Sequence, residues 1–209
     1  LEEKSLLESL SIFNTWQGEG PALELALPMP ETKPNVIYLV NKDEAAQSVI
    51  RIGKRSLKRD ITGEYYRSYL MNFVLGGAFN SRININLRED KGYTYGARSG
   101  FQGDKLSGDY SARAEVRADA TDKSIVEFVK EINGYRESGI TDQELTFMRS
   151  AINQKDALAY ETPRAKLGFM AQILEHDLTP NFVKERQKIH GYEEEWRCFA
   201  LLDWKGAAR

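Results

Sequence analysis

Histidine and cysteine side chains do much of the metal and nucleophilic chemistry of proteins, and this chain has two His and one Cys. An H-x-x-E-H zinc helix needs two His one turn apart, with Glu directly before the second. Glu175 and His176 supply half of that pattern, but Gln172 occupies the position of the first His. His190 lies fourteen residues further on, a separation that fits no local zinc motif. We therefore expect no metal site in this chain and interpret both histidines as ordinary surface or helix-end residues.

Other signatures of catalysis are missing from the sequence as well. It contains no G-x-S-x-G nucleophile elbow, no phosphate-binding P-loop and no paired-Cys redox motif. Gly18-Glu19-Gly20 lacks the third Gly and the following helix pattern of a nucleotide-binding turn. Cys198 would need a positioned base to act as a nucleophile, and a single cysteine excludes an internal disulfide or a Cys-based zinc cluster. The sequence thus predicts no catalytic residue in this chain.

The most informative spacing lies in residues 74–101, VLGGAFNSRININLREDKGYTYGARSGF. An apolar segment ends at Gly76 and Gly77, a polar cap that includes Ser81 opens a short second segment, and that segment ends at Gly92. Glycine readily enters the left-handed conformation that often ends a helix, so we expect the glycines to end these segments. Ser81 is expected to cap the second segment. We interpret all four residues as structural.

This stretch resembles the second-half motif of the M16 family of zinc metallopeptidases, which includes insulinase, pitrilysin and mitochondrial processing peptidase. The family pattern runs LGG-x-x-x-SR-(L/I)-x-x-x-LRE-x-x-G-x-x-Y. The chain matches it at fixed spacing with Leu75-Gly76-Gly77, Ser81-Arg82-Ile83, Leu87-Arg88-Glu89, Gly92 and Tyr95. The resemblance covers roughly residues 34–185 and is sharpest at 75–95, whereas the tail from Ile189 onward departs from the family.

The resemblance implies that this chain is the C-terminal, non-zinc half of such a peptidase. The H-x-x-E-H zinc site would then belong to another half, in the same chain or in a partner subunit. Two such halves enclose a peptide-sized chamber, so the implied partners are a peptide substrate and the zinc-binding half. The implied reaction is zinc-dependent peptide hydrolysis, for which this chain alone would be inactive.

The resemblance also assigns substrate contacts to Arg88 and Tyr95, which lie seven residues apart as in the family. A guanidinium and a phenol are both hydrogen-bond donors, and donors aimed at a peptide carbonyl hold the chain and stabilise developing oxyanion charge. Two structural alternatives remain: Arg88 as a cation in the last turn of a helix, and Tyr95 as a core aromatic on a strand. Tyr93 is a nearby competitor for the tyrosine role, and a sheet edge that adds a peptide strand is a further candidate.

Composition and charge exclude several classes of function. The chain has 209 residues, enough to bury a sizeable core, and 41% of them are hydrophobic. With 29 basic and 31 acidic residues it lacks the concentrated positive charge typical of nucleic-acid binding. No apolar run approaches the length of about 20 residues that a membrane helix needs. Because the chain starts at Leu1, we expect it to be a piece of a longer protein, and we expect a bacterial periplasmic or secreted location.

Hydrophobic periodicity predicts the elements that must position these residues. We expect a helix at 1–13 and a Gly- and Pro-rich linker at 14–35, so that residues 1–33 precede a domain at 34–209. Strands are expected at 36–40, 46–53, 93–101 and 106–118, the last two forming a hairpin around Gly103. Within 106–118, Tyr110, Ala112, Ala114 and Val116 alternate with polar residues, which predicts one buried face. Helices are expected at 65–75, 81–90, 122–138, 141–158 and 165–175. The helix at 122–138 carries an apolar stripe of Ile125, Phe128, Val129, Ile132 and Tyr135, and Thr141 and Glu144 form a capping box at the start of the next one. The segment 81–90 also alternates like a strand, and the M16 resemblance favours a helix there.

The order of elements favours an α+β fold: an M16 metallopeptidase-like domain with an antiparallel-rich sheet and helices packed on one face. Two functions stay open at this point. The first is the substrate-binding half of an active peptidase. The second is a non-catalytic binding or assembly subunit, as in the respiratory-complex core proteins of the same family. An unrelated α+β enzyme is a third possibility, but the sequence holds no motif for one.

Overall fold

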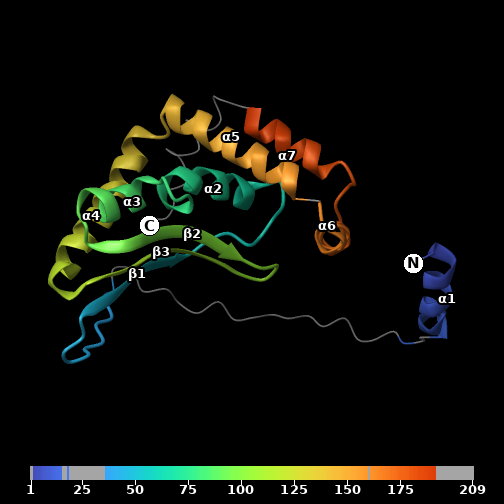
Figure 1. Cartoon of the computed structure of the whole chain (residues 1–209), viewed down its shortest axis with the longest axis horizontal. Coiled ribbons are helices and arrows are strands. Elements are labelled where there is room, and N and C mark those ends of the chain that lie inside the picture. The colour runs from blue at the N-terminus through green and yellow to red at the C-terminus, as the bar shows by residue number, and fades with distance from the viewer. Residues whose placement is uncertain (1, 16–17, 19–35, 160, 192–209) are drawn as a thin grey trace. The chain divides into compact units, whose positions relative to one another are not determined.

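The computed structural model describes residues 2–15, 18, 36–159 and 161–191, and its two compact units are residues 1–33 and 34–209 (Figure 1). The first unit contains helix α1 (Glu3–Leu10), which continues into a 3-10 turn, η1 (Ser11–Thr15). The helix predicted at 1–13 is therefore confirmed. Apart from residues 14, 15 and 18, the predicted linker lies outside the described residues, as does the chain from 192 to the end.

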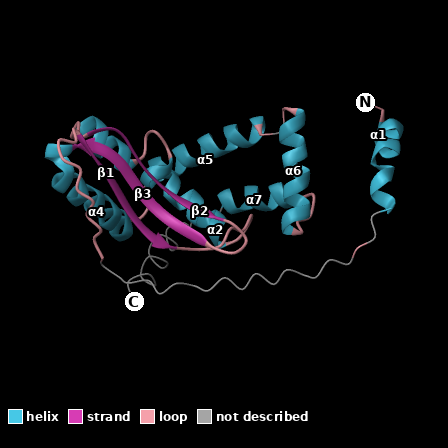
Figure 2. Cartoon of the chain, turned by 90° about the horizontal axis from the view of Figure 1, so that it is seen from below, coloured by secondary structure: helices cyan, strands magenta, loops and turns pink. Residues whose placement is uncertain are grey.

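The second unit is built on a three-stranded antiparallel sheet with the order β1-β3-β2. Its strands are β1 (Gln47–Arg55), β2 (Thr94–Gly103) and β3 (Gly108–Arg117). Every second residue of β3 from Tyr110 to Val116 is buried and the residues between are half-buried or exposed, as the alternating pattern predicted. Figure 1 shows the helices on one face of this sheet, and Figure 2 views the sheet from its other face. The predicted α+β fold is confirmed.

The strand predicted at residues 36–40 is wrong. The described strands do not include Val36–Val40, and four of its side chains are 85–90% exposed. A strand of five apolar residues needs covering elements on both faces, and the described part of the chain places none there. The apolar run alone therefore did not suffice to predict a strand, because it does not specify a partner strand or the elements that would cover it.

The helices follow the predicted order with two irregular turns. Helix α2 (Glu64–Asn72) continues into a π-helical turn, η2 (Phe73–Gly77), and α3 (Arg82–Asn84) continues into a second one, η3 (Ile85–Asp90). After β3 come the 3-10 turn η4 (Ala118–Ala120), α4 (Thr121–Ser138), α5 (Asp142–Leu158), α6 (Pro163–His176) and α7 (Phe182–Gly191). The capping box predicted at Thr141 and Glu144 is present, whereas α7 was not predicted. No helix of the described residues is long and apolar enough to cross a membrane.

The core lies between the helices and the covered face of the sheet. Leu70 of α2, Phe128 of α4 and Met148 of α5 are almost completely buried and pack with the inward residues of β3. The apolar stripe of α4 is narrower than predicted, because Ile125 and Val129 are more than 40% exposed. Burying each large side chain contributes about 1.5–3 kcal/mol, so this layer supplies the stability that holds the segment 73–97 in place.

Candidate functional site

Glycine at position 76 allows a close approach between a helix end and a strand. A Cβ at Gly76 would overlap the Ser99 hydroxyl and lie 2.6 Å from the Ser99 backbone nitrogen. The expectation of a left-handed residue at Gly76 or Gly77 is wrong, because among the described glycines only Gly92 and Gly139 have positive φ. Gly92, at φ +62°, confirms the expectation for the second segment. Gly76 is needed for packing, and Gly92 for its backbone conformation.

A buried pair of side chains fixes the same helix end to β2. Asn72 donates from Nδ2 to the Ser99 carbonyl over 2.8 Å, and Ser99 Oγ donates to Asn72 Oδ1 over 2.5 Å. Both residues are buried, so each polar atom in the pair finds its partner within the protein. This pair was not predicted from the sequence, since its members are 27 residues apart.

Ser81 and Arg82 anchor the start of the second segment. Ser81 occupies the predicted N-cap position and is fully buried. Its side chain makes no capping hydrogen bond, so the prediction is right for the position and wrong for the hydrogen bond. Arg82 makes a two-pronged ion pair with Glu144 over 2.5 and 2.6 Å. Burial would raise the pKa of Glu144, but hydrogen bonds from Arg82 and Thr141 outweigh it and lower that pKa. The motif arginine thus joins this segment to the capping box of α5.

Arg88 lies in the π-helical turn η3, and its side chain is 33% exposed. Its guanidinium carbon sits 4.5 Å from the centroid of the Phe79 ring, and its Nε lies 3.4 Å from Glu89 Oε1. A guanidinium on an aromatic face keeps its N–H donors at the ring edge free to bind another group. π-Helical turns are frequent at functional sites, and the turn that carries Arg88 is one of them.

Tyr95 is 93% exposed, so the alternative of a core aromatic is wrong. The register between β2 and β3 shifts between Thr94 and Ala97, so Tyr95 and Gly96 together oppose Glu115. Such a β-bulge re-aims a side chain that a regular strand would direct elsewhere. Thr94 fixes the bulge by donating from Oγ1 to the Glu115 carbonyl over 2.6 Å and accepting from the Gly96 N–H over 3.1 Å. Tyr93, the competing tyrosine, is half-buried.

Asn84 braces the elements that carry Arg88 and Tyr95. Its Nδ2 donates to the carbonyl of Phe79, the ring that contacts Arg88, over 2.7 Å. Its Oδ1 accepts from the N–H of Ala97, at the end of the bulge, over 2.9 Å. Asn84 is buried, and its role was not predicted from the sequence. An amide between two isoleucines in a buried segment was the available signal, because a buried amide requires partners.

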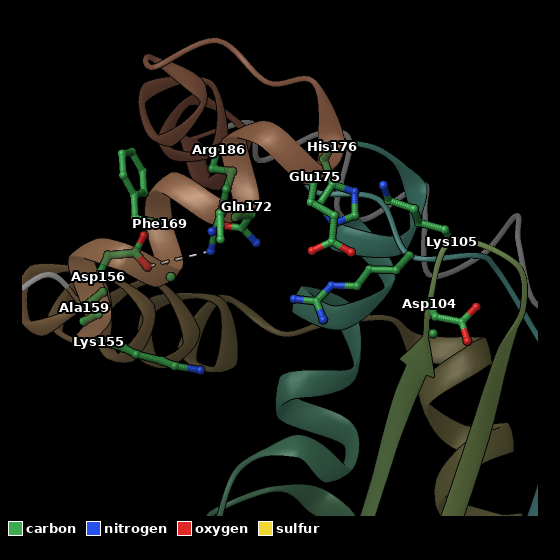
Figure 3. Close-up of a pocket in the computed structure, with 15 residues that line it drawn as sticks. Asp104, Lys105, Lys155, Asp156, Ala159, Phe169, Gln172, Glu175, His176 and Arg186 are labelled. Carbon is green, nitrogen blue, oxygen red and sulfur yellow. Dashed lines mark ion pairs between the residues drawn. The ribbon is translucent and has the colours of Figure 1, made fainter. Parts of the chain in front are cut away.

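A separate hollow of about 480 Å³ lies between the tip of the β2–β3 hairpin and the helices α5, α6 and α7 (Figure 3). Asp156 and Arg186 form an ion pair of 3.8 Å within it, and neither Arg88 nor Tyr95 lines it. Glu175 and His176 both line this hollow. Within the described residues, no group of three or more His, Cys, Asp or Glu side chains could hold a metal ion. Cys198 and the side chain of His190 lie outside the described part.

An antiparallel sheet covered on one face by helices, with a glycine-punctuated turn leading into an edge strand, makes this an α+β domain. The chain belongs to the M16 peptidase family, since residues 3–152 match the family's "Peptidase M16 inactive domain". The predicted membership, as a non-zinc M16 domain, is therefore confirmed.

Relatives of the chain are similar in fold and more distant in sequence. It is 27% identical over 142 residues to the non-peptidase homolog YmxG of Helicobacter pylori, across 67% of this chain and 32% of that protein. The M16 inactive domain from Pseudomonas fluorescens has 20% identity and a TM-score of 0.66, over 74% of this chain and 37% of that one. The periplasmic protease PqqL from Escherichia coli has 13% identity and a TM-score of 0.73, over 96% and 22%. The chain spans about a third of the curated relative's length.

Proposed function

We propose that this domain is the substrate-binding, non-zinc half of an M16 zinc metalloendopeptidase, closing a peptide chamber opposite an H-x-x-E-H half. The observation that carries the proposal is the placement of Arg88 and Tyr95. Both side chains are accessible, and Asn84 links the loop behind one to the strand that carries the other. A braced pair of donors suits the task of holding a peptide, because little motion is lost on binding.

In this proposal the two side chains position the substrate for a reaction whose zinc belongs to the other half. Zinc there would supply the activated water. Arg88 would direct its guanidinium, and Tyr95 its phenol, toward the carbonyl of the bound peptide. As negative charge develops on that oxygen, donors already held in place stabilise it at small reorganisation cost. The Arg88–Phe79 contact and the bulge at Tyr95 would keep both donors oriented.

The test is peptide hydrolysis by the full-length protein, or the complex, that contains the zinc half. Arg88→Ala should lower kcat/KM and leave the unfolding temperature of the protein unchanged. Arg136→Ala, which removes the same charge from α4, is the matched control and should keep normal turnover. Unchanged turnover in the Arg88 variant would remove this residue from the proposed role.

The second candidate is a non-catalytic binding or assembly subunit. The observation that favours it is the relative YmxG, which is described as a non-peptidase homolog. The two functions are separated by incubating the full-length protein with a mixture of peptides, with and without a zinc chelator. Chelator-sensitive cleavage supports the peptidase half, whereas saturable peptide binding without cleavage supports the binding subunit.

We also propose a bacterial periplasmic or secreted location for the parent protein. One structural relative, PqqL, is described as periplasmic, which supports the proposal by analogy only. Cell fractionation with an antibody against this domain tests it, and recovery of the protein with cytoplasmic markers would refute it.

A further inference from the structure

Three arginines lie side by side on the face of the sheet that no described helix covers. Arg51 of β1 is paired directly with Arg113 of β3, and Arg113 is paired directly with Arg98 of β2. Directly opposite residues in antiparallel strands project to the same face, and neighbouring strands lie about 4.8 Å apart. The three therefore form a row across all three strands, here called the arginine row. All three residues are exposed, and the helices pack on the opposite face (Figures 1 and 2).

The arginine row is not neutralised within the described part of the chain. No hydrogen bond or ion pair there joins Arg51, Arg98 or Arg113 to an acidic side chain. Glu115 is the acidic residue nearest to Arg113 along β3. The residues directly opposite Glu115 are Val49 on β1 and the bulge on β2, and not an arginine of the row. Like charges placed opposite each other destabilise a sheet, so the row is unfavourable for folding alone. An arrangement that disfavours folding is a reason to look for a ligand of opposite charge.

The next row along the strands leaves space above the sheet. Gly53, Ser111 and Gly100 are paired across β1, β3 and β2, directly beside the arginine row. None of these residues carries a side chain larger than a hydroxymethyl group, and a Cβ at Gly100 would meet nothing within 4 Å. Glycine in a strand often marks a place where another backbone approaches closely. A polypeptide could therefore lie near the sheet here with its side chains within reach of the guanidinium groups.

We propose that the arginine row binds an acidic segment of an extended polypeptide, whose Asp or Glu carboxylates pair with Arg51, Arg98 and Arg113. The planar guanidinium fork matches a carboxylate with two parallel hydrogen bonds, which suits it to this recognition. The inference rests on the proposed function and deepens it, since it names acidic peptides as the substrate class. Nucleic acid is the other polyanion that arginines bind, but the adjoining row of Gly53, Ser111 and Gly100 suits the close approach of a peptide backbone and so favours a polypeptide.

The test measures binding of fluorescent ten-residue peptides to the 209-residue chain by fluorescence anisotropy. One peptide carries Glu at every second position, and its control carries Gln at the same positions. We expect the Glu peptide to bind at least tenfold more tightly, and we expect its affinity to fall as salt is raised. Each exposed ion pair is worth roughly a threefold change in Kd, so Arg113→Gln should weaken binding about threefold and the triple Gln variant about thirtyfold.

The matched control removes the same charge from elsewhere in the chain. Arg164, Lys166 and Lys184 are exposed on α6 and α7, and their triple Gln variant should bind the Glu peptide with almost unchanged affinity. Because the triple variant of the arginine row removes like-charge repulsion, its unfolding temperature should not fall. If it does not fold, Arg113→Gln and the charge-conserving Arg113→Lys replace it; Arg113→Lys keeps the charge but loses the two parallel hydrogen bonds, so it should weaken binding less than Arg113→Gln does.

Three results would overturn the inference: equal affinity for the Glu and Gln peptides, equal losses in the row and control variants, or complete competition by single-stranded DNA of equal charge. Failure of the inference is distinguishable from failure of the proposed function. If the parent protein hydrolyses neutral peptides in a manner that depends on Arg88, the substrate-binding role stands even when acidic peptides show no preference for the arginine row.

Discussion

Replacing Asn84 by Ala tests whether one buried amide braces the candidate site. The variant leaves the Ala97 N–H and the Phe79 carbonyl without their partners. Ala97 is fully buried, so its unpaired N–H costs about 1–3 kcal/mol. Phe79 is 65% exposed, so its carbonyl is accessible to water and its loss is smaller, about 0.5–1 kcal/mol. The free energy of unfolding should therefore fall by roughly 1.5–4 kcal/mol, or about 3–16 °C in Tm for a chain of this size.

Urea unfolding followed by circular dichroism gives the free energy, and amide hydrogen exchange reports the contact itself. Exchange at Ala97 should accelerate more than exchange at Ala112, which is equally buried on β3. Asn80→Ala is the matched control: Asn80 is exposed and should change stability by less than about 0.5 kcal/mol. Equal stabilities for the two variants, or unchanged exchange at Ala97, would refute the bracing argument.

The remaining predictions concern packing and pH. Gly76→Ala should destabilise the chain by about 1–3 kcal/mol, because the added Cβ would overlap the backbone of Ser99. Gly134→Ala, at an open position in helix α4, should instead stabilise it by about 0.5–1 kcal/mol. Chemical denaturation of the two variants compares these effects. The lowered pKa of Glu144 predicts a contribution to stability that is complete above its ordinary value of 4.5 and is lost as pH falls through the folded-state pKa. Thermal unfolding between pH 3 and 7 should show that decline, and both Glu144→Gln and Arg82→Ala should flatten it; an unchanged profile would contradict the assignment.

Local patterns predicted much of the fold because they depend on near neighbours in the sequence. The alternation in β3 identified its buried face, Thr141 and Glu144 marked a helix start, and Gly92 marked a left-handed residue. Each of these signals is a property of a few adjacent residues.

The misses share a different cause, which is dependence on distant partners. Val36–Val40 reads as a buried strand, but burial requires neighbours that the local sequence does not specify. Gly76 was predicted to end a helix in a left-handed conformation. In the structure a glycine is needed there because Ser99, which is distant in the sequence, packs against it. Asn84 binds Phe79 and Ala97, from both sides of its own segment. For the candidate site, the sequence motif predicted Arg88 and Tyr95. The structure shows the contacts that position them, the Phe79 ring beside Arg88 and the bulge at Tyr95.

The most direct test of the central claim is a double-mutant cycle on kcat/KM in the full-length protein that contains the zinc half. Removing a donor to a developing oxyanion typically costs about 100-fold or more in rate, so Tyr95→Phe should lower kcat/KM by roughly that factor, while Tyr93→Phe should have little effect. If Arg88 and Tyr95 hold the same peptide group, Arg88→Ala combined with Tyr95→Phe should lose clearly less than the sum of the two single losses. Wild-type kcat/KM in the Tyr95→Phe variant, with both variants folded, would contradict the account.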